Sequence, residues 1–161
     1  MARRWKPVAV AIAAALAVAL IGGLATDIGS WYRQLTKPSW QPPDWLFGPV
    51  WTTIYALVVV AGVRAWRLAG GSVQREWLIV LLASNGFVNV LWSLLFFRLQ
   101  RPDWALMEVG VLWSSVLALT IVVWRRDPLG GVLLLPYLAW VSFASFLNLT
   151  IVGLNAPFAG R

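Results

Sequence analysis

The side chains that could do chemistry in this chain are few, and they lie inside apolar segments. Asn85, Asn89 and Trp92 recur at positions i, i+4 and i+7, which places them on one face of a helix. Amides in such a segment must face protein or a cavity, so they either hydrogen-bond neighbouring helices or orient a ligand. The spacing alone supports interhelical hydrogen bonding and ligand binding equally.

A second candidate stripe lies near the C-terminal end of the chain. Tyr137, Trp140, Ala144 and Asn148 follow the same helical spacing, and Leu147 borders them. The small Ala144 between larger side chains leaves room either for a neighbouring helix or for a flat ligand. Spacing does not decide between the two.

Glu108 is the one carboxylate well inside an apolar segment. An acid within a membrane span marks a functional site by default. However, Glu108 lies about one turn inside its expected helix, where the helix dipole, loop water, or Arg98 and Arg101 would stabilise it. Both interpretations stay open, with the structural one favoured. A lone acid also makes a poor proton relay, so an ion-coupled transporter is not expected.

The chain contains no cysteine and no histidine. Their lack excludes disulfides, thiolate chemistry, Cys/His zinc sites and the commonest general base. No paired carboxylates or phosphate-binding loop replace them. The residues therefore predict no metal site, no required cofactor and no ordinary hydrolase, and they favour a binding protein over an enzyme.

Five apolar segments must position these side chains. Of the 161 residues, 60% are hydrophobic and 12% charged, far more apolar than the roughly 45–50% and 25% of soluble domains. Since an open sheet cannot satisfy its edges in lipid, we expect an all-α integral membrane protein, a five-transmembrane-helix bundle forming a single domain over residues 1–161. The expected helices cover about residues 7–26, 47–66, 77–97, 104–124 and 132–154.

The longest polar connection, about residues 27–46, is rich in tryptophan and proline. Proline restricts the backbone and aromatic rings supply rigid contact area, so this segment is either an ordered lid or an interfacial aromatic belt. A lid carrying Arg33 and Lys37 over an aromatic-lined apolar pocket would suit a flat amphipathic ligand with acidic groups at its edge.

The net charge of +7 comes from short basic groups between the apolar segments. This pattern is typical of membrane-flanking loops and forms no basic stripe for nucleic acid, so the expected partner is the lipid bilayer. The N-terminus with the second and fourth connections carries eight basic residues against five on the other side, which favours an N-terminus inside. Small residues from Ala11 to Gly23 at spacing four suggest a helix that packs or dimerises rather than a cleaved signal peptide.

Four blocks of sequence match a known family. They are KPSWQPPDWLFGPVWTTIY (37–55), NVLWSLLFF (89–97), PDWALMEVGVLW (102–113) and PYLAWVSFASFLN (136–148). In these blocks, and in order along essentially the whole chain, the sequence resembles the TspO/MBR family of tryptophan-rich sensory proteins and translocator proteins, as a bacterial-type member.

The resemblance implies a homodimeric five-helix bundle in the bacterial cell membrane, with a ligand cavity beneath the first connection. Ligands of the family are porphyrins, such as protoporphyrin IX or a haem-like tetrapyrrole, and synthetic benzodiazepine-type compounds. By motif, the ligand contacts fall on Trp51, Asn89, Trp92, Trp104, Ala144 and Leu147, with Trp40 and Trp45 in the matching lid. The helical stripes and the intramembrane acid add Asn85, Glu108, Tyr137, Trp140 and Asn148 to the expected ligand-binding residues.

The resemblance implies a receptor or sensor for tetrapyrroles, with a link to their transport or regulation. The alternative is a light-dependent porphyrin-degrading activity that uses cavity tryptophans, with Trp51 as the candidate catalytic residue. Sterol recognition is not expected from the end of the last helix. That segment reads LNLTIVGLN (147–155) and lacks the Tyr and Arg of the family's cholesterol-associated pattern.

Overall fold

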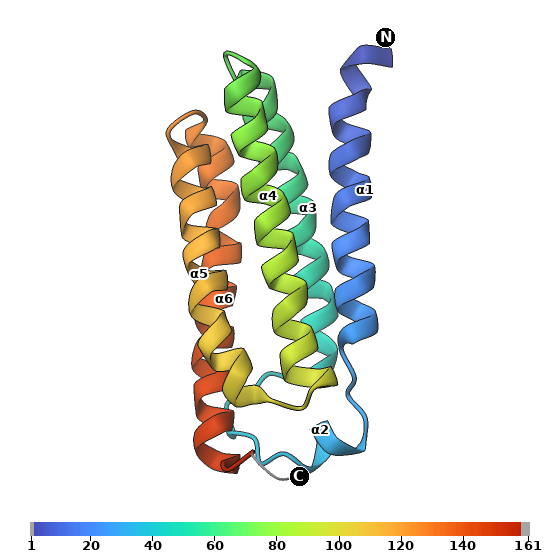
Figure 1. Cartoon of the computed structure of the whole chain (residues 1–161), viewed down its shortest axis with the longest axis vertical. Helices are drawn as coiled ribbons and strands as arrows, with labels where there is room; N and C mark the ends of the chain where they lie inside the picture. The colour runs from blue at the N-terminus through green and yellow to red at the C-terminus, as the bar shows by residue number, and fades with distance from the viewer. Residues whose placement is uncertain (1, 159–161) are drawn as a thin grey trace.

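Five long helices form an elongated bundle (Figure 1). The computed structural model of the chain describes the backbone of residues 2–158 and the side chains of residues 5–158. The long helices are α1 (Ala2–Ala25), α3 (Asp44–Leu68), α4 (Ser72–Ser93), α5 (Pro102–Trp124) and α6 (Pro128–Asn155), and the π-helical turn η1 (Leu94–Arg98) continues α4. Each long helix has the length and composition to cross a membrane. The expected all-α fold of five transmembrane helices is confirmed.

Several helices begin earlier than the sequence predicts. α3 starts at Asp44 rather than near residue 47, α4 at Ser72 rather than near 77, and α6 at Pro128 rather than near 132. At α6 the reason is close packing. A methyl group on Gly131 would lie 2.5 Å from a ring atom of Trp124 and 2.8 Å from its Cα, so the glycine is needed for the tight turn from α5. Gly131 and the preceding Gly130 therefore belong to α6 and not to the loop.

The five helices form a closed ring around the interior. α5 packs most extensively against α6, α3 contacts α6, α4 contacts α5, and α1 closes the ring by touching both α3 and α4. In Figure 1 the start of α1 lies at one end of the bundle, whereas the short helix α2 (Ser30–Gln34) and the end of α6 lie at the other. We call the end that carries α2 the lid end, and the opposite end the N-terminal end.

Most serine and threonine hydroxyls inside the spans donate to carbonyls of their own helices. The hydroxyls of Thr53, Thr120 and Ser145, for example, donate to the carbonyl four residues earlier at 2.7 to 2.9 Å. Such bonds remove the penalty of placing a polar group in hydrocarbon, where water is absent. Serine and threonine in the spans therefore do not by themselves mark a site.

Apart from Glu108, charged residues gather at or near the ends of the apolar spans. At the N-terminal end the Arg64 guanidinium donates two hydrogen bonds to the Asp127 carboxylate, at 2.6 Å from Nε and 2.9 Å from Nη2, and ties α3 to the turn between α5 and α6. These bonds, with backbone N–H groups of Leu129 and Gly130, lower the pKa of Asp127. Three of the basic residues counted to predict the orientation of the N-terminus have side chains outside the described residues, namely Arg3, Arg4 and Arg161.

The ion pair predicts an acid-sensitive component of stability. Since the folded-state pKa of Asp127 lies below the ordinary value of about 3.9, the stabilisation is complete above that pH and is lost as the pH falls through the lowered pKa. Asp127→Asn should unfold at lower temperature than the wild type at neutral pH, and it should lose part of the acid dependence. Thermal scans of tryptophan fluorescence measure both, with the exposed Glu76→Gln as the control. Identical curves for Asp127→Asn and wild type would show that the pair contributes nothing.

Candidate functional site

A hydrogen-bonded network of polar side chains lies at the centre of the bundle. The Tyr137 hydroxyl donates to Asn85 Oδ1 at 3.1 Å and accepts from Asn89 Nδ2 at 3.2 Å. The Tyr55 hydroxyl donates to Asn89 Oδ1 at 3.0 Å, and Asn85 Nδ2 donates to the Ser115 hydroxyl at 2.8 Å. We call these five residues the central network.

The central network joins α3, α4, α5 and α6. Asn85, Asn89 and Tyr137 are buried, at 5%, 4% and 2% exposure. Because water does not reach these polar groups, the hydrogen bonds between them are what satisfies them. This closed arrangement supports the structural interpretation of the two amides. The network does not use the full hydrogen-bonding capacity of the two amides, because each amide nitrogen carries a second N–H and each oxygen a second acceptor position. The network can therefore stabilise the bundle and also orient a ligand.

A cavity of about 410 Å³ leads from the central network toward the N-terminal end. Its walls are α1, α3 and α4, and Tyr55, Asn85, Asn89 and Tyr137 lie among the residues that line it. Most of the other lining residues are small or aliphatic, such as those of α1 between Val10 and Val18. An apolar space with a few convergent polar groups is the usual form of a small-molecule site. The two sequence stripes thus meet at a cavity, but it lies on the side of the network away from the lid.

Aromatic rings border the central network on its other side. Trp51 stacks on Tyr55, with ring centroids 5.5 Å apart, and lies edge-on to Tyr137 at 6.0 Å. Trp92 stacks on Phe96 at 5.1 Å and packs toward both the network and the lid. Trp51 and Trp92 therefore lie beside the central network.

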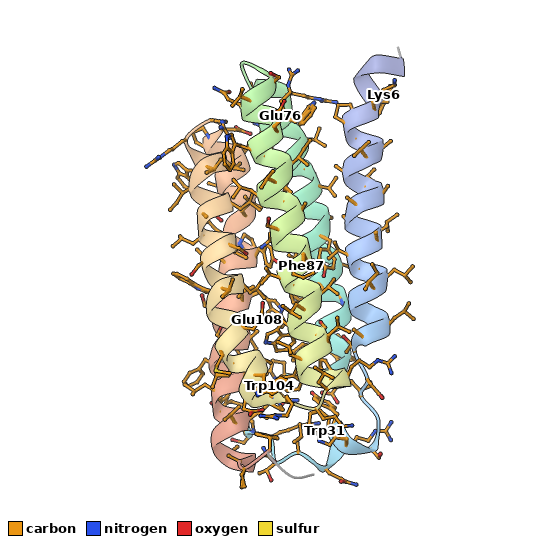
Figure 2. All side chains as sticks on the ribbon, in the orientation of Figure 1. Lys6, Trp31, Glu76, Phe87, Trp104 and Glu108 are labelled. Atoms are coloured by element: carbon orange, nitrogen blue, oxygen red, sulfur yellow. The ribbon has the colours of Figure 1, made fainter. Side chains whose placement is uncertain are left out.

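The carboxylate of Glu108 is buried without a hydrogen-bond partner among the described residues. Arg101 pairs with Asp103, and Arg98 donates to the Leu24 carbonyl, so neither of these bonds involves Glu108. Glu108 precedes Ser115 by seven residues and so shares the face of α5 that meets α4. Figure 2 places it between the levels of Phe87 and Trp104 along the bundle. An unpaired acid in this position is an incomplete polar site.

The region directly beneath the lid is filled by side chains. Phe96, Leu147 and Ile151 are buried there, with Trp31 and Phe97 packed against them. Trp31 meets Phe96 edge-on at 6.1 Å, and Figure 2 shows Trp31 at the end opposite Lys6. Leu147, an expected ligand contact, therefore belongs to an aromatic cluster that a ligand beneath the lid would have to displace.

The first connection is an ordered lid containing α2. The buried Tyr32 hydroxyl donates to Asp44 Oδ1 at 3.0 Å, and the Lys37 ammonium lies 3.6 Å from the centroid of its ring. Burial and the Asp44 carboxylate raise the pKa of Tyr32. Asn155 exchanges two hydrogen bonds of 2.8 Å with the backbone of Thr36, which fastens the lid to the end of α6. Sequence reasoning missed this role of Tyr32 and Asn155, since only the fold brings residues 36 and 155 together.

Three expected tryptophans lie toward the outside of the bundle, and a fourth, Trp140, is half-buried. Trp40, Trp45 and Trp104 are 43%, 71% and 44% exposed, and the Arg101 guanidinium lies 4.2 Å from the centroid of the Trp104 ring. Trp140 packs on Phe47 and Phe143 and lines a shallow groove between α3 and α6. The structure does not bring the three exposed rings to the central network, whereas Trp140 packs against the same core cluster as Trp51 and Trp92.

The remaining two expected residues lie on α6. Asn148 is 1% exposed and faces the first turn of α5, where its amide can donate to the Pro102 carbonyl and accept from the Leu106 N–H, both at 3.1 Å. That contact satisfies groups at a helix start. Ala144 is half-buried on the same helix. Asn148 therefore has a structural partner.

The central network predicts unequal effects of two conservative substitutions. Tyr137→Phe leaves a buried acceptor on Asn85 and a donor on Asn89 unpaired, so it should destabilise the bundle by roughly 1–2 kcal/mol. Tyr55→Phe removes a single bond and should have about half that effect. Denaturant or thermal unfolding in detergent measures the stability of the wild type and of the two variants, and so ranks them. Equal stability of all three proteins would show that the network is incidental.

Comparisons with known proteins agree with this architecture. The model of the TspO/MBR family matches residues 9–154. The chain is 38% identical to a tryptophan-rich protein TspO of Chlorobaculum tepidum over 157 residues, which cover 96% of this chain and 99% of the relative. It is 35% identical to a tryptophan-rich sensory protein of Cereibacter sphaeroides, covering 94% and 92%, and 32% identical to the translocator protein of Homo sapiens, covering 92% and 89%. The chain belongs to the TspO/MBR family and is a multi-pass integral protein of the bacterial cell membrane.

Proposed function

We propose that this membrane receptor binds a porphyrin-type tetrapyrrole in the cavity that ends at the central network. The observation that carries the proposal is the convergence of Asn85, Asn89 and Tyr137 at the inner end of an otherwise apolar space of about 410 Å³. Flat, mostly apolar ligands suit such walls, and a few fixed polar groups set their orientation. The same shape and polarity suit benzodiazepine-type ligands.

Groups at both ends of the cavity match the chemistry of a tetrapyrrole. At the inner end, the Tyr55 ring lines the cavity and stacks on Trp51, which lies on the other side of the central network. Outside the cavity lining, the unpaired carboxylate of Glu108 is a further acceptor for N–H groups. At the outer end, Lys6 lines the mouth and offers a cation for an acidic edge. The family relatives are named as sensory and translocator proteins, which supports a receptor role.

Protoporphyrin titration tests the proposal. The purified protein should show saturable quenching of tryptophan fluorescence. Trp51→Phe should weaken binding roughly threefold to tenfold, because it removes the indole that stacks on the cavity-lining Tyr55, a contact worth about 0.5–1.5 kcal/mol. Asn89→Ala should weaken it further by removing a polar contact. The matched control is Trp77→Phe, which removes an exposed indole near the start of α4. Linear, non-saturating quenching, or equal affinities for Trp51→Phe and Trp77→Phe, would contradict the proposal.

Glu108 provides a test that separates a functional role from a structural one. Its carboxylate is unpaired in an apolar interior, so Glu108→Leu should raise the unfolding temperature of the ligand-free protein. The same variant should bind protoporphyrin several-fold more weakly because an acceptor is lost. Glu108→Gln keeps one carbonyl oxygen, so its protoporphyrin affinity should lie between those of the wild type and Glu108→Leu. A destabilised Glu108→Leu protein with unchanged affinity would assign Glu108 to the fold.

Other expectations from the sequence stay predictions. They are the linked transport or regulation of the ligand, light-dependent degradation through Trp51, the homodimer, and the inside orientation of the N-terminus. Porphyrin movement across sealed vesicles and product formation under illumination, each against a denatured control, distinguish transport and degradation from binding alone.

A further inference from the structure

The N-terminal half of α1 stands away from its neighbours. Toward the lid end α1 is held close, because Arg98 Nη2 donates to the Leu24 carbonyl at 2.7 Å and a methyl group on Gly86 would lie 2.9 Å from a methyl of Val18. From Val18 to Lys6 the cavity separates α1 from α3 and α4. At 1.5 Å per residue this part of the cavity is about 18 Å long, so it is a long and narrow slot.

The slot opens sideways to the surrounding lipid. Val10 of α1 and Ile79 of α4 both line it, yet they are 68% and 52% exposed. Water gains little in such a space because the walls between Val10 and Val18 offer it no hydrogen-bond partners. A hydrocarbon chain entering from the bilayer loses no hydration and gains dispersion contacts with both walls. Lipid is therefore the natural occupant of the slot.

The mouth of the slot is cationic. Lys6 lines it, and the Arg75 guanidinium lies 5.4 Å from the centroid of Trp66, another lining residue. The same end carries Arg67, Arg125 and Arg126. At this end of the bundle the Asp127 carboxylate is already paired with Arg64. Figure 2 also shows Glu76 at this end. Basic side chains at a membrane surface attract anionic headgroups by about 1 kcal/mol each.

We propose that the slot binds one acyl chain of an anionic phospholipid from the leaflet at the N-terminal end, with the lipid phosphate at Lys6. The apolar walls hold the chain, and the basic mouth selects the headgroup. The site does not depend on the ligand being a tetrapyrrole. It overlaps the outer part of the proposed ligand cavity, so a bound chain keeps the cavity filled until a ligand displaces it.

Lipid retention tests the proposal directly. The protein is reconstituted in nanodiscs of equal parts phosphatidylglycerol and phosphatidylcholine and extracted into detergent, and bound lipids are counted by native mass spectrometry. The wild type should retain phosphatidylglycerol in preference to phosphatidylcholine. Lys6→Ala should reduce that preference roughly fivefold, whereas Lys6→Arg should keep it. Ala14→Trp, which fills the slot, should release both lipids.

Two matched controls distinguish the slot from the general surface. Ala13→Trp places the same ring on an exposed position that does not line the cavity and should retain lipid like the wild type. Lys6 is exposed, so Lys6→Ala folds normally and decides the test if Ala14→Trp does not fold. Equal retention of the two lipids by the wild type, or unchanged retention by Ala14→Trp, overturns the proposal. So does a lipid-free wild-type dimer that Ala14→Trp converts to monomer, because a second chain would then fill the slot. Protoporphyrin affinity is measured separately, so failure of one proposal does not imply failure of the other.

Discussion

The hydrogen bonds between Asn85, Asn89 and Tyr137 hold the bundle together where no water can compete. Packing alone gives helices in lipid little preference for one register over another, because lipid tails are as apolar as leucine. A buried amide on α4 has few partners of the right geometry, so pairing it with Tyr55, Ser115 and Tyr137 fixes the heights and rotations of four helices together. The positions of Trp51, Trp92 and Glu108 relative to one another follow from that register.

The helix outside this network is α1, and its freedom creates the cavity. Its close contacts lie toward the lid end, at Leu24 and Val18, whereas its N-terminal half is lined by small residues that fill little space. A bundle of four tied helices and one loosely held helix has an interior that lipid-soluble molecules can reach from the side. Such an opening suits ligands that partition into membranes, since they need not cross the water layer.

The aromatic residues fall into groups that differ in burial and in structural role. Tyr32, Trp31 and Phe96 seal the lid end, and Asn155 fastens that seal to α6. Trp51 and Trp92 border the central network. Trp45 and Trp77 are largely exposed at the ends of their spans, as expected for rings at a membrane interface. The 12 tryptophans among the 161 residues therefore include lid, interior and interface positions.

The sequence by itself determined the fold class, the number of spans and the stripe of Asn85 and Asn89, because hydropathy and helical period act locally and lipid permits few alternatives. It could not place Trp104 or Trp40, since a ring near a helix end faces either the interior or lipid depending on how the neighbouring helices rotate. It could not foresee that Gly130 and Gly131 lie inside α6, because Gly130 is needed by its close approach to Val123 and Asp127, and Gly131 by its contact with Trp124. The tertiary structure alone decided which side of the central network is open, which acid lacks a partner, and how Asn155 meets Thr36. Each of these depends on contacts between residues far apart in the chain, which spacing along one helix does not encode.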